Sequence, residues 1–86
     1  MPTISRFYGI DIQMYFDELH GPHFHAIYSG RKAQISALDG IVMGGKLPPR
    51  ALRYTDKWYK LRRAEVLENW ERARRGEKLK WIEGLP

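Results

Sequence analysis

The sequence contains no cysteine, which excludes disulfide bonds and thiolate metal ligands. It also has no apolar run close to the roughly 20 residues that a membrane-spanning helix needs. Its N-terminal residues lack the basic segment followed by an apolar stretch that is typical of a secretory signal. From these absences we expect a cytoplasmic protein without a membrane partner.

The length of 86 residues predicts a single domain, residues 1–86, with one modest core. Hydrophobic residues make up 43% of the chain and charged residues 29%, a balance typical of globular proteins and unlike that of disordered ones. Three Trp, five Tyr and three Phe can build a core from few side chains, because each aromatic ring buries a large area.

Basic residues are concentrated in the second half of the chain, where twelve Lys and Arg outnumber six Asp and Glu. The net charge is −1 over residues 1–45 and +6 over residues 46–86, which together give the total of +5. Such asymmetry favours an anionic partner, either a nucleic acid or a protein with an acidic face. The alternative is a solvated helical surface without a partner.

The first half of the chain, residues 1–45, has the pattern of short strands. Apolar and polar residues alternate there, and turn signals such as Tyr8-Gly9, Gly21-Pro22 and Asp39-Gly40 separate the runs. We therefore predict a small antiparallel sheet of four to five strands within residues 3–43. The predicted strands cover residues 3–7, 10–16, 23–28, 32–38 and 41–43, and Gly44-Gly45 ends the pattern.

The second half, residues 46–86, has helical periodicity. Leu47-Pro48-Pro49 is a favourable helix start, and Gly76 is a favourable residue to follow a helix end. We predict two helices, residues 49–62 and 64–75, packed on one face of the sheet in an α+β fold. The tail after Gly76 carries Leu79, Trp81, Ile82 and Leu85, enough apolar surface to dock on the body.

The first predicted helix carries a basic stripe, which we define as Arg50, Arg53, Lys57 and Lys60. These four residues fall within about 80° of one another at 3.6 residues per turn. In the second predicted helix the spacing predicts the compensating pairs Glu68–Arg72 and Glu71–Arg75. The basic stripe is therefore the predicted phosphate-binding element, with affinity that depends on salt and reads little sequence.

All three histidines lie in one segment, His20-Gly21-Pro22-His23-Phe24-His25, and we call them the histidine cluster. His23 and His25 project from the same face of a strand, and His20 can fold back towards them. Several interpretations stay open, including plain structural residues at the sheet edge.

One chemical interpretation is acid–base catalysis by His23 and His25, which would make the protein a metal-independent ribonuclease using the 2′-hydroxyl as nucleophile. A second is contact with nucleic acid, in which His20 would join the basic stripe. A third is binding of a divalent metal such as zinc by His20, His23 and His25, with Asp17 or Glu18 as a further ligand. Only this third interpretation calls for a cofactor.

Several motifs occur together in an order that resembles a known family. They are Met1-Pro2-Thr3-Ile4 with Arg6-Phe7 and Gly9, then the histidine segment, then Leu47-Pro48-Pro49-Arg50-Ala51-Leu52, and then Leu67-Glu68-Asn69-Trp70-Glu71-Arg72-Ala73. In this combination the chain resembles the small bacterial proteins of domain-of-unknown-function family 4160. The resemblance implies a short standalone protein, often encoded beside another small protein, and some members are described as toxin–antitoxin components or regulators.

The chain departs from the family pattern at one position. Members commonly carry a further histidine after the residue that is Leu61 here, where this sequence has Arg62. If that histidine is catalytic, this chain lacks it, whereas arginine would preserve a phosphate contact.

Together these features predict a toxin–antitoxin-like component. It would bind RNA or another anionic partner through a surface that joins the histidine cluster to the basic stripe. One alternative is a protein–protein interaction module without catalysis, which would bind a small cognate protein through the basic helix. A homodimer would instead form through an exposed sheet edge. The other alternative is a metal-binding protein.

Overall fold

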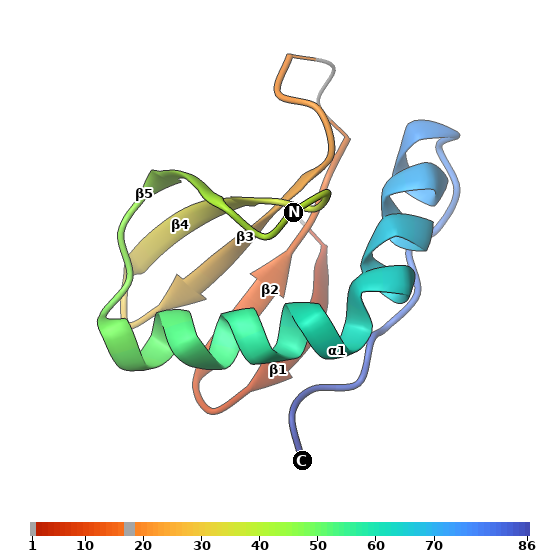
Figure 1. Cartoon of the computed structure of the whole chain (residues 1–86). Coiled ribbons are helices and arrows are strands. Elements are labelled where there is room, and N and C mark those ends of the chain that lie inside the picture. The colour runs from red at the N-terminus through yellow and green to blue at the C-terminus, as the bar shows by residue number, and fades with distance from the viewer. Residues whose placement is uncertain (1, 17–18) are drawn as a thin grey trace.

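The structure is a computed structural model that describes residues 2–16 and 19–86 (Figure 1). Its elements are β1 (Thr3–Phe7), β2 (Ile10–Gln13), β3 (His23–Tyr28), β4 (Arg31–Ser36), β5 (Val42–Gly45) and α1 (Pro49–Arg74). The strands form one antiparallel sheet in the order β1-β2-β3-β4-β5. The predicted α+β class is confirmed. No helix in the described part of the chain is long and apolar enough to cross a membrane.

The core lies between the sheet and the first half of α1. Alternation along β3 directs Phe24 towards the helix, where its ring lies 5.7 Å from that of Trp58 and 5.9 Å from that of Tyr59, measured between ring centroids. Phe7 also stacks on Trp58, with the ring centroids 5.6 Å apart. Burial of such a side chain stabilises the fold by about 2 kcal/mol, so this aromatic group anchors α1 to the sheet.

The prediction of two helices is wrong, because the structure has a single helix that bends at Arg62. There φ is −114° and ψ is 18°, outside the helical region, but the helix continues on both sides. No glycine or proline occurs between Pro49 and Gly76 to end the helix, so the chain changes direction without stopping. We call residues 49–61 the first half of α1 and residues 63–74 the second half.

The bend gives the two halves different surroundings. Figure 1 shows the first half lying across the sheet and the second half turning away from it, with the C-terminal tail returning beside the second half. Hydrogen bonds to α1 and β1 hold the tail. Among them, Lys80 N–H donates to Asn69, Ile82 N–H donates to the carbonyl of Ile4, and Trp58 Nε1–H donates to the carbonyl of Glu83. Ile82 is fully buried, so the predicted docking of the tail is confirmed at that residue.

Three predicted strands differ from the observed ones. The fourth is Arg31–Ser36 instead of residues 32–38. The second ends at Gln13 instead of residue 16, and the fifth runs from Val42 to Gly45, so the two glycines lie inside the strand that they were expected to end. Gly45 has a φ of +77°, and a Cβ there would collide with the backbone carbonyl of Lys32 on β4. Glycine is therefore what lets β5 approach β4 at this point.

Candidate functional site

The structure brings the three histidines together. The ring centroids of His23 and His25 are 5.3 Å apart, and those of His20 and His23 are 5.8 Å apart. Tyr15 lies beside both strand histidines, at 6.0 Å from His23 and 5.6 Å from His25. On its other side His23 contacts Trp70 of the second half of α1, with the centroids 5.5 Å apart. The proximity of the rings, which the spacing permits but does not require, is therefore present, and the neighbouring side chains are aromatic.

His23 is held in one orientation by the turn that precedes its strand. Its Nδ1 lies 2.8 Å from the carbonyl oxygen of Gly21. A carbonyl can only accept a hydrogen bond, so Nδ1 donates and carries the proton. Gly21 has a φ of +67°, which bends the chain so that this carbonyl can reach the ring. The contact fixes the turn to the start of β3.

His25 lies two residues further along β3, and its environment disfavours the charged form of its ring. Burial lowers its pKa below the ordinary value, and the positive charges of His23, Lys32 and His20 lower the pKa further. Its Nδ1 is buried and has no hydrogen-bond partner among the described residues. At neutral pH His25 is therefore a neutral ring within the sheet surface.

The solvent exposure of the three rings distinguishes between the interpretations of the histidine cluster. His23 is 1% exposed and His25 6%, whereas His20 is exposed. A general acid or base must reach its substrate within hydrogen-bond distance, and two buried rings do not offer that reach. Within residues 2–16 and 19–86, no group of three or more metal-ligating side chains is arranged to hold an ion. Asp17 and Glu18, the predicted further ligands, lie outside the described residues.

The basic stripe points away from the sheet. All four of its side chains are exposed, as the helical spacing predicts. Lys60 forms an ion pair with Asp56 at 2.9 Å. Arg50, Arg53 and Lys57 form no ion pair with any residue that the structure describes. Three adjacent cations on the first half of α1 therefore carry charge that no acidic residue in the described part of the chain neutralises.

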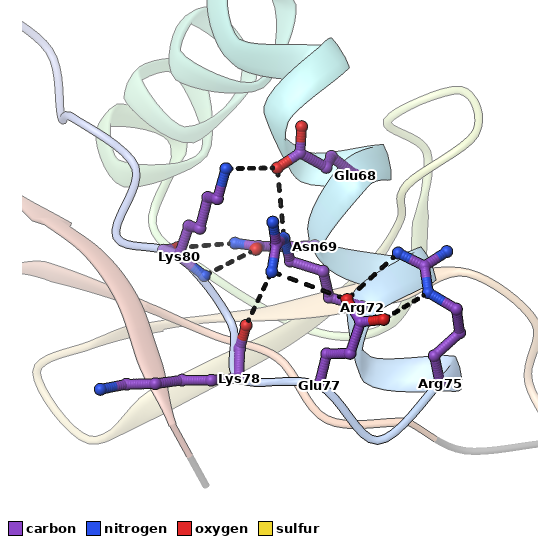
Figure 2. A network of polar contacts seen from close by, with 7 residues as sticks. All are labelled: Glu68, Asn69, Arg72, Arg75, Glu77, Lys78 and Lys80. Atoms are coloured by element: carbon purple, nitrogen blue, oxygen red, sulfur yellow. Dashed lines mark hydrogen bonds and ion pairs between the residues drawn. The ribbon is translucent and has the colours of Figure 1, made fainter.

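The cations of the second half are arranged differently. Glu68 forms ion pairs with Arg72, at 3.3 Å, and with Lys80, at 3.4 Å, and Arg75 forms an ion pair with Glu77 at 2.9 Å (Figure 2). The hydrogen bond from Arg72 lowers the pKa of Glu68, and that from Arg75 lowers the pKa of Glu77. The positive charge of this region is therefore largely compensated within the molecule.

One predicted ion pair of this region is confirmed and the other is replaced. Glu68 pairs with Arg72 as the spacing predicts. Glu71 pairs with Arg74 at 2.8 Å instead of with Arg75. The helix ends at Arg74, and Arg75 follows as its C-cap residue, where it pairs with Glu77. Gly76 comes next with a φ of +73°, in the position after the helix that the sequence predicts for it.

The histidine cluster and the basic stripe do not share a surface. His23 is at one end of β3 against the second half of α1, while Tyr28, at the other end, lines a pocket with Arg50. The two ends are about 16 Å apart at 3.3 Å per residue. Side chains at odd and even positions of β3 also point to opposite faces. The two predicted features are thus separate sites.

Two pockets flank the first half of α1, and sequence reasoning found neither. One, of about 410 Å³, lies towards β4 and β5 and is lined by Arg53 and Asp56 among others. The other, of about 590 Å³, lies towards the β1–β2 turn and is lined by Tyr8, Tyr28 and Tyr54 together with Arg50. These tyrosines come from the β1–β2 turn, β3 and α1, and only the packing of the helix on the sheet brings them together, so no local sequence signal indicates the pocket.

Arg62, the position where family members commonly carry histidine, lies at the bend of α1. Its guanidinium lies 3.5 Å from Glu65 and 3.5 Å from Glu83, and its Nε is buried without a partner among the described residues. Its charge is therefore directed to acidic groups of the chain itself.

Comparison with known proteins gives one match. The family model described as domain of unknown function DUF4160 matches residues 9–71, which include the histidine cluster, the basic stripe and Trp70. No curated protein and no solved structure matches the chain. Because the family model covers more than half of the sequence, the resemblance is confirmed, and the chain belongs to the DUF4160 family.

Proposed function

We propose that this protein binds RNA through Arg50, Arg53 and Lys57 and acts as a component of a toxin–antitoxin-like pair. The observation that carries the RNA-binding part is the set of three exposed cations without acidic partners on one side of the first half of α1. An uncompensated row of cations attracts a phosphate backbone and gains free energy from the release of counterions. The toxin–antitoxin part is supported by the resemblance to the family alone.

The spacing of the three cations also supports the proposal. Arg50, Arg53 and Lys57 are separated by three and four residues, so their side chains project in a row along about 10 Å of the helix. Successive phosphates of a nucleic-acid strand are several ångströms apart, so one strand can contact all three. Lys60 is a weaker candidate than the sequence predicted, because Asp56 already neutralises it.

The proposal leaves cleavage out. His23 and His25 are the predicted acid–base pair, but both rings are buried and lie on the opposite face of β3 from Arg50. We assign them a structural role: with Tyr15 and Trp70 they fill the space between the start of β3 and the second half of α1. His20 is exposed, but it belongs to the same histidine cluster, so we do not include it in the proposed contact with RNA.

A titration with charge-matched variants tests the binding. The triple variant Arg50→Gln, Arg53→Gln, Lys57→Gln loses three charges from the first half. The control Arg74→Gln, Arg75→Gln, Lys78→Gln loses three charges from exposed positions beyond the bend. We expect fluorescence anisotropy with a labelled oligouridylate to show at least about tenfold weaker binding for the first variant and little change for the control. Equal weakening of both variants would contradict the proposal.

A second candidate function is binding of a partner protein at β5. The opposite edge of the sheet is covered, because the tail bonds to Ile4 of β1. Around β5, however, the apolar side chains of Leu38, Ile41, Val42 and Met43 are exposed. An open strand edge with exposed apolar residues favours pairing with another chain, including a second copy. Light scattering of the wild type and of Val42→Lys tests this: a dimer that the lysine disrupts supports it, and a monomeric wild type removes the homodimer.

A further inference from the structure

The pocket beside Arg50 has an unusual lining for a surface hollow. Tyr8, Tyr28 and Tyr54 form its walls, and Ile10 and Ala51, both buried, lie at its base. Its volume of about 590 Å³ falls within the range of small-molecule sites in proteins. Three aromatic rings around one opening provide flat apolar surfaces that are accessible from outside.

The tyrosine rings are held in place by the fold. The Tyr8 ring packs edge-on against Tyr54, with centroids 4.9 Å apart, and its hydroxyl donates a hydrogen bond to the backbone carbonyl of Pro86. Tyr28 lies against Gly9, where a Cβ would be 3.5 Å from the ring. Tyr8 is nevertheless 50% exposed. The pocket is thus formed before any ligand arrives, which reduces the entropy lost on binding.

The pocket offers hydrogen-bonding groups as well as rings. The hydroxyls of Tyr28 and Tyr54 have no hydrogen-bond partner among the described residues. A hydroxyl can donate to or accept from the polar edge of a ligand. The lining therefore suits a flat aromatic molecule with polar groups around its rim.

Charge distinguishes this pocket from the one on the other side of the helix. There Arg53 is accompanied by Asp56, which opposes an anionic ligand. Here Arg50 is the charged residue of the lining, and it forms no ion pair with any described residue. Arg50 is also the first residue of the basic stripe, so a phosphate strand lying along the stripe ends at the mouth of this pocket.

We propose that the pocket lined by Tyr8, Tyr28 and Tyr54 holds one unpaired base of an RNA strand whose adjacent phosphate contacts Arg50. This inference rests on the proposed RNA binding and deepens it by adding recognition of a base to contacts with the backbone. Stacking of a base on an aromatic side chain accepts every base, so the pocket gives a preference for single-stranded over paired RNA and little sequence preference.

Two probes distinguish binding of the base from binding of the phosphate backbone. One is an oligouridylate, and the other is a chain of the same length made of abasic ribose phosphates. We expect the wild type to bind the oligouridylate about tenfold more tightly than the abasic chain. Tyr54→Leu and Tyr28→Leu lose this preference, while Tyr54→Phe keeps it because the ring remains. Arg50→Gln weakens both probes by a similar factor. Circular dichroism of each variant establishes that it is folded.

The outcomes are distinct. Equal affinity of the wild type for both probes, or equal weakening of both probes by the tyrosine-to-leucine variants, overturns the base-binding pocket and leaves the proposed RNA binding standing. Binding of neither probe overturns the proposed function and the pocket together. Displacement of the oligouridylate by the same concentration of uridine monophosphate assigns the pocket to a free nucleotide and overturns the assignment to RNA.

Discussion

The two halves of α1 carry similar numbers of cations and use them in different ways. In the first half Arg50, Arg53 and Lys57 face outwards without acidic partners, and the inner side is fixed to the sheet by aromatic rings. In the second half Arg72 and Arg74 pair with glutamates, and the inner side meets a polar network and the histidine cluster. The comparison teaches that the distribution of partners, and not the net charge of +5, distinguishes the face whose cations lack ion pairs with described residues from the face whose cations are paired.

The largest expected effect concerns the aromatic anchors of the two halves. Trp58→Ala is expected to lower the free energy of unfolding by about 4–5 kcal/mol and Trp70→Ala by about 3 kcal/mol. Trp58 is completely buried and donates a hydrogen bond to Glu83, whereas Trp70 is 6% exposed and its indole nitrogen has no such bond among the described residues. Urea denaturation followed by circular dichroism measures both values.

Equal losses for the two variants would contradict the view that the first half is the more firmly anchored one. If an alanine variant does not fold, Trp58→Phe and Trp70→Phe are expected to show the same order.

A smaller effect is expected from the polar network of the second half. Asn69 is buried, and its amide donates to the carbonyl of Lys80 and accepts from the N–H of the same residue, at 2.8 and 2.9 Å. Asn69→Ala leaves both backbone groups without these bonds and is expected to cost about 1–3 kcal/mol. Hydrogen exchange should become faster at the amides of Lys80 and Ile82 and stay unchanged in β3. Faster exchange throughout β3 would show that the two halves are not independent.

The sequence predicts much of this arrangement because most of it depends on local patterns. Alternating residues predict the strands, and the three- and four-residue spacing correctly places the basic stripe on an exposed face. The sequence prediction divides this helix in two, although no glycine or proline lies near Arg62 to end it, and no local pattern predicts that one helix bends there. Asn69 gives no signal either, because its partner Lys80 is defined only once the tail folds back.

The candidate site, too, is predicted only as far as it depends on local sequence patterns. The spacing of the histidines permits their rings to converge but does not require it, and the structure shows that the neighbouring rings lie 5.3 and 5.8 Å apart. Their burial depends on Tyr15 and Trp70, which come from two other elements. The three tyrosines of the pocket are 20 to 46 positions apart in the sequence, so they become neighbours only when the helix packs on the sheet.

The smallest effect is expected at the histidine cluster. Since the pKa of His25 in the folded protein lies below its ordinary value, the unfolded chain binds its proton more readily, and stability falls as the pH drops through and below about 6.5. The groups that act on it are His20, His23 and Lys32. His25→Gln is expected to reduce the fall in Tm between about pH 7.5 and pH 5.5. An unchanged fall in Tm would show that His25 does not contribute to acid sensitivity.

The dependence of RNA affinity on salt tests the central claim most directly. For single-stranded RNA, each phosphate contact adds about 0.7 to the slope of log K against log salt concentration. Replacing Arg50, Arg53 and Lys57 by glutamine is therefore expected to make the slope shallower by about 2, while the same change at Arg74, Arg75 and Lys78 leaves it as in the wild type. Equal slopes for both variants would show that RNA is attracted by the net charge and not by the first half of α1.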